Sequence, residues 1–219
     1  MFLGHYALGF AAKKWAPKIS LGTLFLASVW LDLLWSLFLL LGWETVVISP
    51  GITKVVSIDF TDYSLSHSLV MALAWAVFLG FIYFMFSKNE KTSLVLMGLV
   101  ISNWFLNVVV HRPDMHLLPA GNPMDVRWGL GLWNSIPGTI VVEGLLFAAG
   151  LWIYLTSTKA KDLAGQLIFW ALCAAMVFVF ADIFLMTAPK SPKWVAVVGQ
   201  VELLFVAWGY WVDDHRKSA

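Results

Sequence analysis

The chain has 219 residues, of which 60% are hydrophobic and 12% are charged. Soluble globular domains carry about 25% charged residues, so this composition excludes that class and indicates a protein that crosses a membrane several times. The formal net charge is +1, and basic residues do not gather with aromatic ones, which argues against a nucleic-acid partner. With a single cysteine, the chain cannot form an internal disulfide.

Six apolar stretches each approach or exceed the length of about 20 residues that a membrane-spanning helix needs. They predict an all-α transmembrane bundle that forms one integral-membrane domain over residues 1–219. The six ranges are 21–42, 64–86, 92–110, 134–156, 164–187 and 194–212. Under this topology nine of the fourteen Lys and Arg residues share a side with both chain ends, which favours cytoplasmic termini.

A further apolar segment, residues 2–12, precedes the first predicted span and is too short to cross a bilayer. Two interpretations remain open for it. It is either an interfacial helix that lies on the membrane, or a re-entrant half-helix that enters from the cytoplasm and turns at Pro17. We favour the re-entrant half-helix, because the segment offers no polar face to water. His5 then lies inside the membrane.

Acidic residues occur within the predicted spans, whereas Lys and Arg do not. The four acids are Asp32, Glu143, Asp182 and Glu202. A carboxylate at the centre of a bilayer costs about 3 kcal/mol, so it is tolerated where it faces a protein interior and finds a proton, a cation or hydrogen-bond donors. With no Lys or Arg beside them, a metal, a proton or a histidine is the expected partner.

Polar side chains recur at every fourth position in three predicted spans, so each of these helices presents one polar face. They are Ser28, Asp32 and Ser36; Asn103, Asn107 and His111; and Ser135, Thr139 and Glu143. The second span begins near His67. At about 1.5 Å per residue, the predicted depths increase outward from His5, Asp32 and Asn103 to Asn107, His67 and His111. We therefore expect one polar cavity that opens to the outside.

Five short motifs follow one another along the first 156 residues. They are Gly4-His5, Leu31-Asp32-Leu33-Leu34-Trp35, Tyr63-Ser64-Leu65-Ser66-His67-Ser68-Leu69, His111-Arg112-Pro113-Asp114, and Gly129-Leu130-Gly131-Leu132-Trp133-Asn134-Ser135 with Glu143 after it. In order and spacing they resemble a group of small bacterial inner-membrane proteins, the YdjM-like membrane-bound metal-dependent hydrolases. The resemblance implies location in the bacterial inner membrane among its lipids.

The resemblance also implies a chemistry. A divalent metal, zinc or manganese, would be held by His5, Asp32, His67 and His111 and would activate water. Asp114 or Glu143 would act as the base, and the substrate would be an ester or phosphoester of a lipid-like molecule.

One motif departs from the group, which has Ser-His-Trp and then Asp four residues after the His. This chain has Asn103 and Asn107 at these two positions. An amide oxygen is a poor zinc ligand, so the predicted ligand set is weakened. The two replacements keep open a second function, a non-catalytic accessory subunit of a larger membrane complex or homo-oligomer. The unpaired acids keep open a third, a cation or proton transporter.

Overall fold

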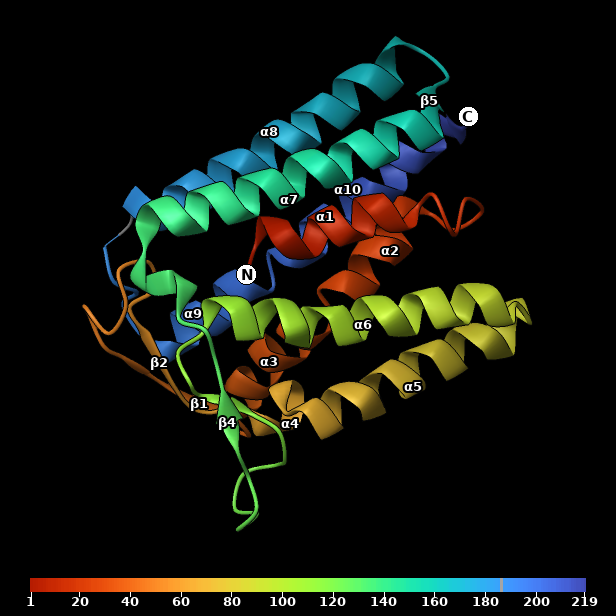
Figure 1. Ribbon diagram of the computed structural model, residues 1–219. Helices are drawn as coiled ribbons and strands as arrows, with labels where there is room; N and C mark the ends of the chain where they lie inside the picture. The colour runs from red at the N-terminus through yellow and green to blue at the C-terminus, as the bar shows by residue number, and fades with distance from the viewer. Residues whose placement is uncertain (186) are drawn as a thin grey trace.

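The computed structural model describes residues 1–185 and 187–219, so residue 186 of the predicted span 164–187 lies outside the described residues. Helices dominate the structure (Figure 1). The helices are α1 (Leu3–Ala12), α2 (Leu21–Ser28), α3 (Trp30–Leu41), α4 (Ser64–His67), α5 (Leu69–Ser87), α6 (Glu90–Val110), α7 (Ile136–Ser157), α8 (Leu163–Leu185), α9 (Pro192–Gly199), α10 (Glu202–Asp214) and the 3-10 turn η1 (Leu132–Asn134).

The strands form three short antiparallel pairs in the connections. The pairs are β1 (Thr45–Ile48) with β2 (Ile58–Asp62), β3 (Met115–His116) with β4 (Arg127–Trp128), and β5 (Thr158–Ala160) with β6 (Arg216–Ser218). Five helical stretches are long and apolar enough to cross a membrane: α5, α6, α7, α8, and α9 with α10. The bent pair α2 and α3 makes a sixth if it counts as one span. The prediction of an all-helical bundle is confirmed, and five of its helical stretches are candidate membrane spans.

The first predicted span, 21–42, is not one straight helix. It breaks at Val29 into α2 and α3, which meet at a bend of 59°. Ser28 Oγ donates to the carbonyl oxygen of Phe25 at 2.9 Å, a side-chain bond that competes with the backbone ladder and bends helices. The break leaves Asp32 in the first turn of α3, where the positive end of the helix dipole stabilises a carboxylate.

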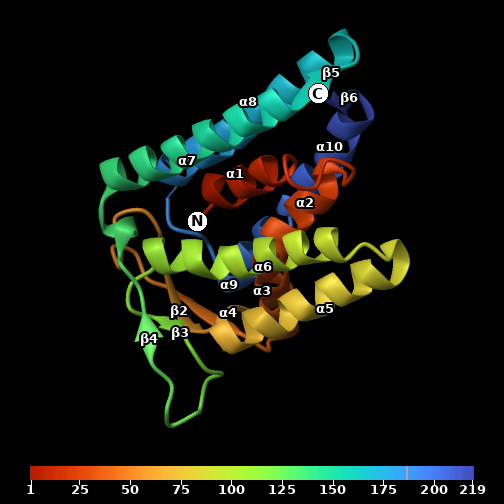
Figure 2. The same ribbon diagram turned by 45° about the vertical axis from the view of Figure 1, so that its right-hand side comes forward.

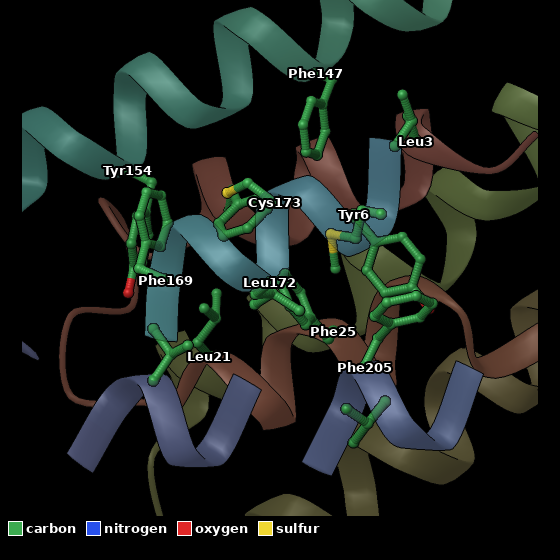
Figure 3. Close-up of a cluster of buried hydrophobic side chains, with 14 of the residues drawn as sticks. Leu3, Tyr6, Leu21, Phe25, Phe147, Tyr154, Phe169, Leu172, Cys173 and Phe205 are labelled. Atoms are coloured by element: carbon green, nitrogen blue, oxygen red, sulfur yellow. The ribbon is translucent and has the colours of Figure 1, made fainter. Parts of the chain in front are cut away.

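Helix α1 lies inside the bundle, between α7 on one side and α6 on the other, with α2 alongside (Figures 1 and 2). Nine of its ten residues are buried. Tyr6 and Phe10 pack edge to face on Phe25, with ring centroids 5.1 and 4.8 Å apart respectively. Figure 3 shows the apolar cluster that these helices build with α7, α8 and α10. This cluster fixes the position of His5, which α1 carries.

The outward faces of the long helices are large and apolar. Phe86 on α5 is 88% exposed, Trp152 on α7 69% and Leu185 on α8 82%. An exposed apolar surface of this extent suits contact with lipid rather than with water.

The connections sort to two ends of the bundle (Figure 2). At one end the α7–α8 connection pairs with the C-terminal strand β6, and Lys13 Nζ lies 2.5 Å from Asp213 Oδ1. At the other end the two long loops meet, where the backbone N–H of Lys54 donates to the carbonyl oxygen of Trp133 at 3.0 Å. The α5–α6 turn lies at the same end as the C-terminus.

Close packing of α1 on α7 depends on Gly150. A Cβ at this position would lie 2.3 Å from the carbonyl oxygen of Ala7, a backbone atom that cannot turn aside. Gly150→Val should therefore lower the free energy of unfolding by roughly 1–3 kcal/mol, the usual cost of overpacking. Thermal unfolding in detergent measures the change. Gly144→Val on the same helix is the matched control, because nothing lies within 4 Å of its Cβ position; equal melting temperatures for the two variants would contradict this packing.

Candidate functional site

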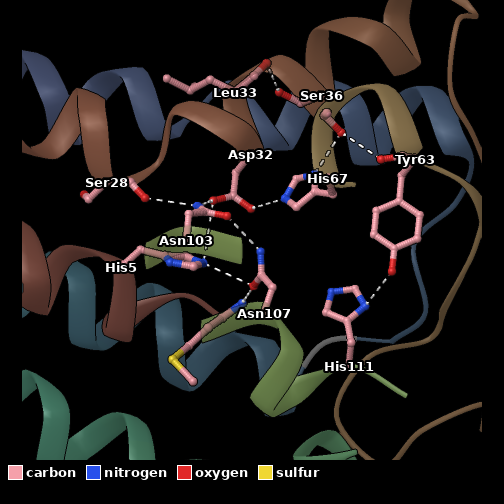
Figure 4. Close-up of polar contacts among 12 residues, drawn as sticks. His5, Ser28, Asp32, Leu33, Ser36, Tyr63, His67, Asn103, Asn107 and His111 are labelled. Carbon is pink, nitrogen blue, oxygen red and sulfur yellow. Dashed lines mark hydrogen bonds and ion pairs between the residues drawn. The ribbon is translucent and has the colours of Figure 1, made fainter. Parts of the chain in front are cut away.

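A small polar cavity lies where α3, α4 and α6 meet (Figure 4). Its volume is about 90 Å³, which suits a few water molecules. The polar lining comes from Asp32, Tyr63, His67, Asn107 and His111, and the aromatic lining from Trp35, Phe60 and Trp133, with Met1 closing one side. Of the four predicted ligand residues, Asp32, His67 and His111 line this cavity together with the altered position Asn107, whereas His5 does not.

Asp32 is the centre of the site. His5 Nε2 lies 3.6 Å from Asp32 Oδ2, and His67 Nε2 lies 3.5 Å from Asp32 Oδ1. Both separations exceed the range of about 2.7–3.2 Å for a hydrogen bond to nitrogen. Asn103 Nδ2, by contrast, donates directly to Asp32 Oδ2. The carboxylate therefore has an amide donor from α6 and an imidazole on either side of it.

The two asparagines of α6 are tied into hydrogen bonds between helices. Asn103 Nδ2 also donates to the carbonyl oxygen of Ser28, where α2 ends, and Asn103 Oδ1 accepts from Asn107 Nδ2, each at 3.0 Å. Asn107 Oδ1 lies 3.2 Å from His5 Nε2 and accepts from the Met1 amino group at 2.6 Å. These bonds connect α6 to α1 and α2, so both amides have a structural role.

His111 and Asp114 form a pair just beyond the end of α6. His111 Nδ1 lies 3.0 Å from Asp114 Oδ1, which also accepts from Tyr63 OH at 3.0 Å. Burial lowers the pKa of His111 to about 4, against the opposing effect of Asp114, so the imidazole is neutral at pH 7. Burial raises the pKa of Asp114, but hydrogen bonds from His111, Tyr63 and Arg112 outweigh it and bring the pKa below its usual value.

The ionised Asp114 can only accept hydrogen bonds, so the Nδ1 of His111 carries the proton and Nε2 keeps its lone pair. Burial and the negative charge of Asp114 raise the pKa of Tyr63 well above its usual value, so its hydroxyl stays a donor. Since His111 lines the cavity, the pair can offer an unprotonated nitrogen to a molecule bound there.

The loop after β4 holds the His111 ring in place. The backbone N–H of Gly131 donates to the carbonyl oxygen of His111 at 2.6 Å, and a Cβ on Gly129 would lie 1.7 Å from the carbonyl oxygen of Arg112. The ring of Trp133 packs on the imidazole with centroids 4.5 Å apart. The motif that begins at Gly129 and includes Gly131 and Trp133 thus holds the backbone and the ring of His111 in position.

Glu143, the second predicted base, does not line this cavity. Its Oε2 accepts the backbone N–H groups of Phe2 at 2.9 Å and Gly4 at 3.3 Å. A carboxylate in this position caps the first turn of α1 and is stabilised by the helix dipole. The structure therefore gives Glu143 the role of anchoring α1 to α7, and it places Asp114, the other predicted base, behind His111.

Two buried residues of the site carry no prediction from the sequence. Glu44, 2% exposed, accepts from the backbone N–H of Ser66 at 2.7 Å, and Ser66 Oγ lies 2.8 Å from His67 Nδ1. The available signals were weak: an acid that follows Gly42-Trp43 in an apolar region, and a serine next to a histidine.

The predicted metal ligands His5, Asp32, His67 and His111 do not form a metal-binding arrangement. Within residues 1–185 and 187–219, no group of three or more His, Cys, Asp or Glu side chains is arranged to hold a metal ion. Asn103 directs an amide N–H at Asp32, where a cation would require a lone pair. The residues in this arrangement therefore do not fit a resident divalent metal.

Comparisons with known protein families, with curated proteins and with solved structures give no match. The YdjM-like resemblance accordingly stays a prediction, and a function is inferred below from the geometry of the site alone.

Proposed function

We propose that the chain is a membrane-embedded hydrolase, related to the YdjM-like group, that cleaves an ester or phosphoester of a lipid-like substrate. The observation that carries the proposal is the His111–Asp114 pair at the edge of a small polar cavity. A neutral imidazole whose other nitrogen is held by a buried carboxylate is the arrangement that general-base hydrolysis requires.

In the proposed reaction, His111 Nε2 takes a proton from a water molecule in the cavity. The water oxygen forms a bond to the carbonyl carbon or phosphorus of the substrate, and the bond from that atom to the leaving oxygen breaks. The imidazolium then returns its proton to the leaving alkoxide, so atoms and charge balance. Asp114 stabilises the imidazolium and keeps the ring in one tautomer. Asp32 accepts a hydrogen bond from the water and orients it.

The lining of the cavity supports a lipid-like substrate. Trp35, Phe60 and Trp133 form its apolar walls, next to the polar groups that would act on the scissile bond. At about 90 Å³ the cavity has room for the scissile linkage and water rather than for an acyl chain. The acyl chain would lie against the outer edges of these rings, which have an apolar body and tolerate a wet edge.

The decisive experiment is an assay of the purified protein in lipid nanodiscs with a panel of carboxylic-ester and phosphoester lipids. The proposal requires release of product from at least one of them above the rate of empty nanodiscs. Failure with every ester in the panel would reject hydrolysis at this site.

A non-catalytic accessory subunit is the second candidate, and the asparagine network favours it. Asn103 and Asn107 join three helices through hydrogen bonds, which is a structural use of positions where the related group would have ligands. If the chain is an accessory subunit, we expect it to hydrolyse no ester. We also expect it to co-purify stably with a membrane partner from native membranes.

We also propose six membrane spans, with the C-terminus and the segment after α1 in the cytoplasm, and a re-entrant α1. The expected cytoplasmic N-terminus is replaced by one inside the bundle, where the Met1 amino group donates to Asn107 Oδ1. The location of the α5–α6 turn, the α7–α8 connection and β6 at one end of the bundle supports it, because these segments carry the basic excess. Reporter fusions in the turn at Lys88–Lys91 should read as cytoplasmic, and fusions near Lys54 as external. If the two sets of fusions report the same side of the membrane, this topology is rejected.

A further inference from the structure

A carboxylate, a hydroxyl and an imidazole form a buried chain behind the cavity. Glu44, in the loop between α3 and β1, accepts the backbone N–H of Ser66 on Oε1 at 2.7 Å. Ser66 Oγ lies 2.8 Å from Glu44 Oε2 and 2.8 Å from His67 Nδ1. Their exposed fractions are 2% for Glu44, 0% for Ser66 and 4% for His67. Figure 4 shows His67 next to Asp32.

The hydrogens along this chain can be assigned by counting donors. Ser66 has one hydroxyl hydrogen, and its Oγ also lies 3.2 Å from the carbonyl oxygen of Tyr63. With Glu44 as a carboxylate, Glu44 and this carbonyl can only accept, so the hydroxyl donates to one of them and not to His67. Ser66 Oγ must then accept from His67 Nδ1, which therefore carries the imidazole hydrogen. In the neutral imidazole the other nitrogen, Nε2, is left with its lone pair, 3.5 Å from Asp32 Oδ1.

Two acceptors thus face one another at the edge of the cavity. A lone pair on His67 Nε2 and a carboxylate oxygen of Asp32 repel unless a donor lies between them or beside them. One O–H of a water molecule beside the line that joins them can be shared between both acceptors, and its second O–H is left for His111. Both residues line the cavity, so a water bound there would have its oxygen directed at a substrate.

We propose that Glu44 and Ser66 are positioning residues that hold His67 in its Nδ1-protonated tautomer and so create an acceptor pair, His67 and Asp32, that binds the attacking water. The role of this acceptor pair in catalysis rests on the proposed function, whereas the tautomer of His67 does not. Glu44 and Ser66 thus do for His67 what Asp114 does for His111. In each case a buried carboxylate outside the cavity determines which imidazole nitrogen faces the cavity.

Nuclear magnetic resonance of the protein with isotope-labelled histidine side chains, in nanodiscs near neutral pH, tests the proposal directly. The His67 signals are identified by their loss in His67→Asn. Wild type should show His67 mainly as the Nδ1–H tautomer. In Glu44→Gln the amide can donate to Ser66 Oγ, which frees the hydroxyl to donate to His67 Nδ1. The tautomer ratio should then shift by about tenfold toward Nε2–H, the size expected from one hydrogen bond to a charged group.

Ser66→Ala removes the hydroxyl without adding a donor, and it should leave His67 as a mixture of tautomers. Glu90→Gln, at the exposed start of α6, and Ser102→Ala, whose hydroxyl bonds only within α6, are the matched controls and should leave the ratio unchanged. An Nε2–H tautomer or a doubly protonated His67 in wild type, or an unchanged ratio in Glu44→Gln, would overturn the proposal. A shifted ratio in a protein that hydrolyses no ester would support the positioning role while rejecting the proposed function.

Discussion

His111→Gln should reduce turnover of a hydrolysed ester by about 10²- to 10⁴-fold, which is the contribution of a general base in other enzymes. The amide has no lone pair basic enough to take a proton from water, although it keeps much of the shape of the imidazole. The fold should survive, because the loop at Gly131 bonds to the backbone carbonyl of His111, which the substitution keeps, although the contact between the imidazole and Trp133 is lost. Turnover and thermal unfolding of the same preparation measure the two effects.

Asp114→Asn separates the orienting role from the base itself. An asparagine side chain can donate to Nδ1, which would place the imidazole hydrogen on Nε2 and remove the lone pair from the cavity. Turnover should therefore fall nearly as far as in His111→Gln, although His111 is still present. His215→Gln, half-buried just after α10 and outside the site, is the control for loss of an imidazole. Turnover of His111→Gln equal to that of the His215 variant would remove His111 from the mechanism.

The membrane-spanning helices could be predicted from the sequence because about 20 consecutive apolar residues have few other stable arrangements. Helices α5 to α8 begin and end within five residues of the predicted ranges. The bend at Val29 could not be predicted, since neither proline nor glycine marks it. It arises where Ser28 bonds within its own helix and the amide of Asn103 donates to the Ser28 carbonyl, and the second bond depends on how distant helices pack.

The site was predictable to the extent that it follows helical periodicity. The spacing of Asn103, Asn107 and His111 places them on one face of α6, and this face does line or adjoin the cavity. The same periodicity also placed Glu143 on a polar face but could not show that the face meets the N-terminus of α1. Glu44 lies in a loop, where no periodicity applies and only tertiary packing brings it to Ser66.

Restoring a histidine at position 103 and an aspartate at 107 should raise the affinity for zinc by about tenfold or more, equivalent to about 1.4 kcal/mol. In the native chain Asn103 presents an N–H group to Asp32. An imidazole there would present a lone pair instead, and a carboxylate at 107 would add a second anionic oxygen close to His5. Both are stronger ligands for zinc-like ions than an amide oxygen. Elemental analysis and competition with a chelator of known affinity measure the occupancy.

The matched control is Asn89→His with Asn122→Asp, which makes the same two chemical changes in connections outside the site. If Asn103→His with Asn107→Asp binds zinc no better than this control, the two asparagines do not occupy ligand positions. The interpretation of the site as a metal centre altered by two amides would then fail. A rise confined to the double variant would instead show that His5, Asp32 and His67 are placed for a metal that the native amides exclude. The His111–Asp114 pair would then be the native chain's own means of activating water.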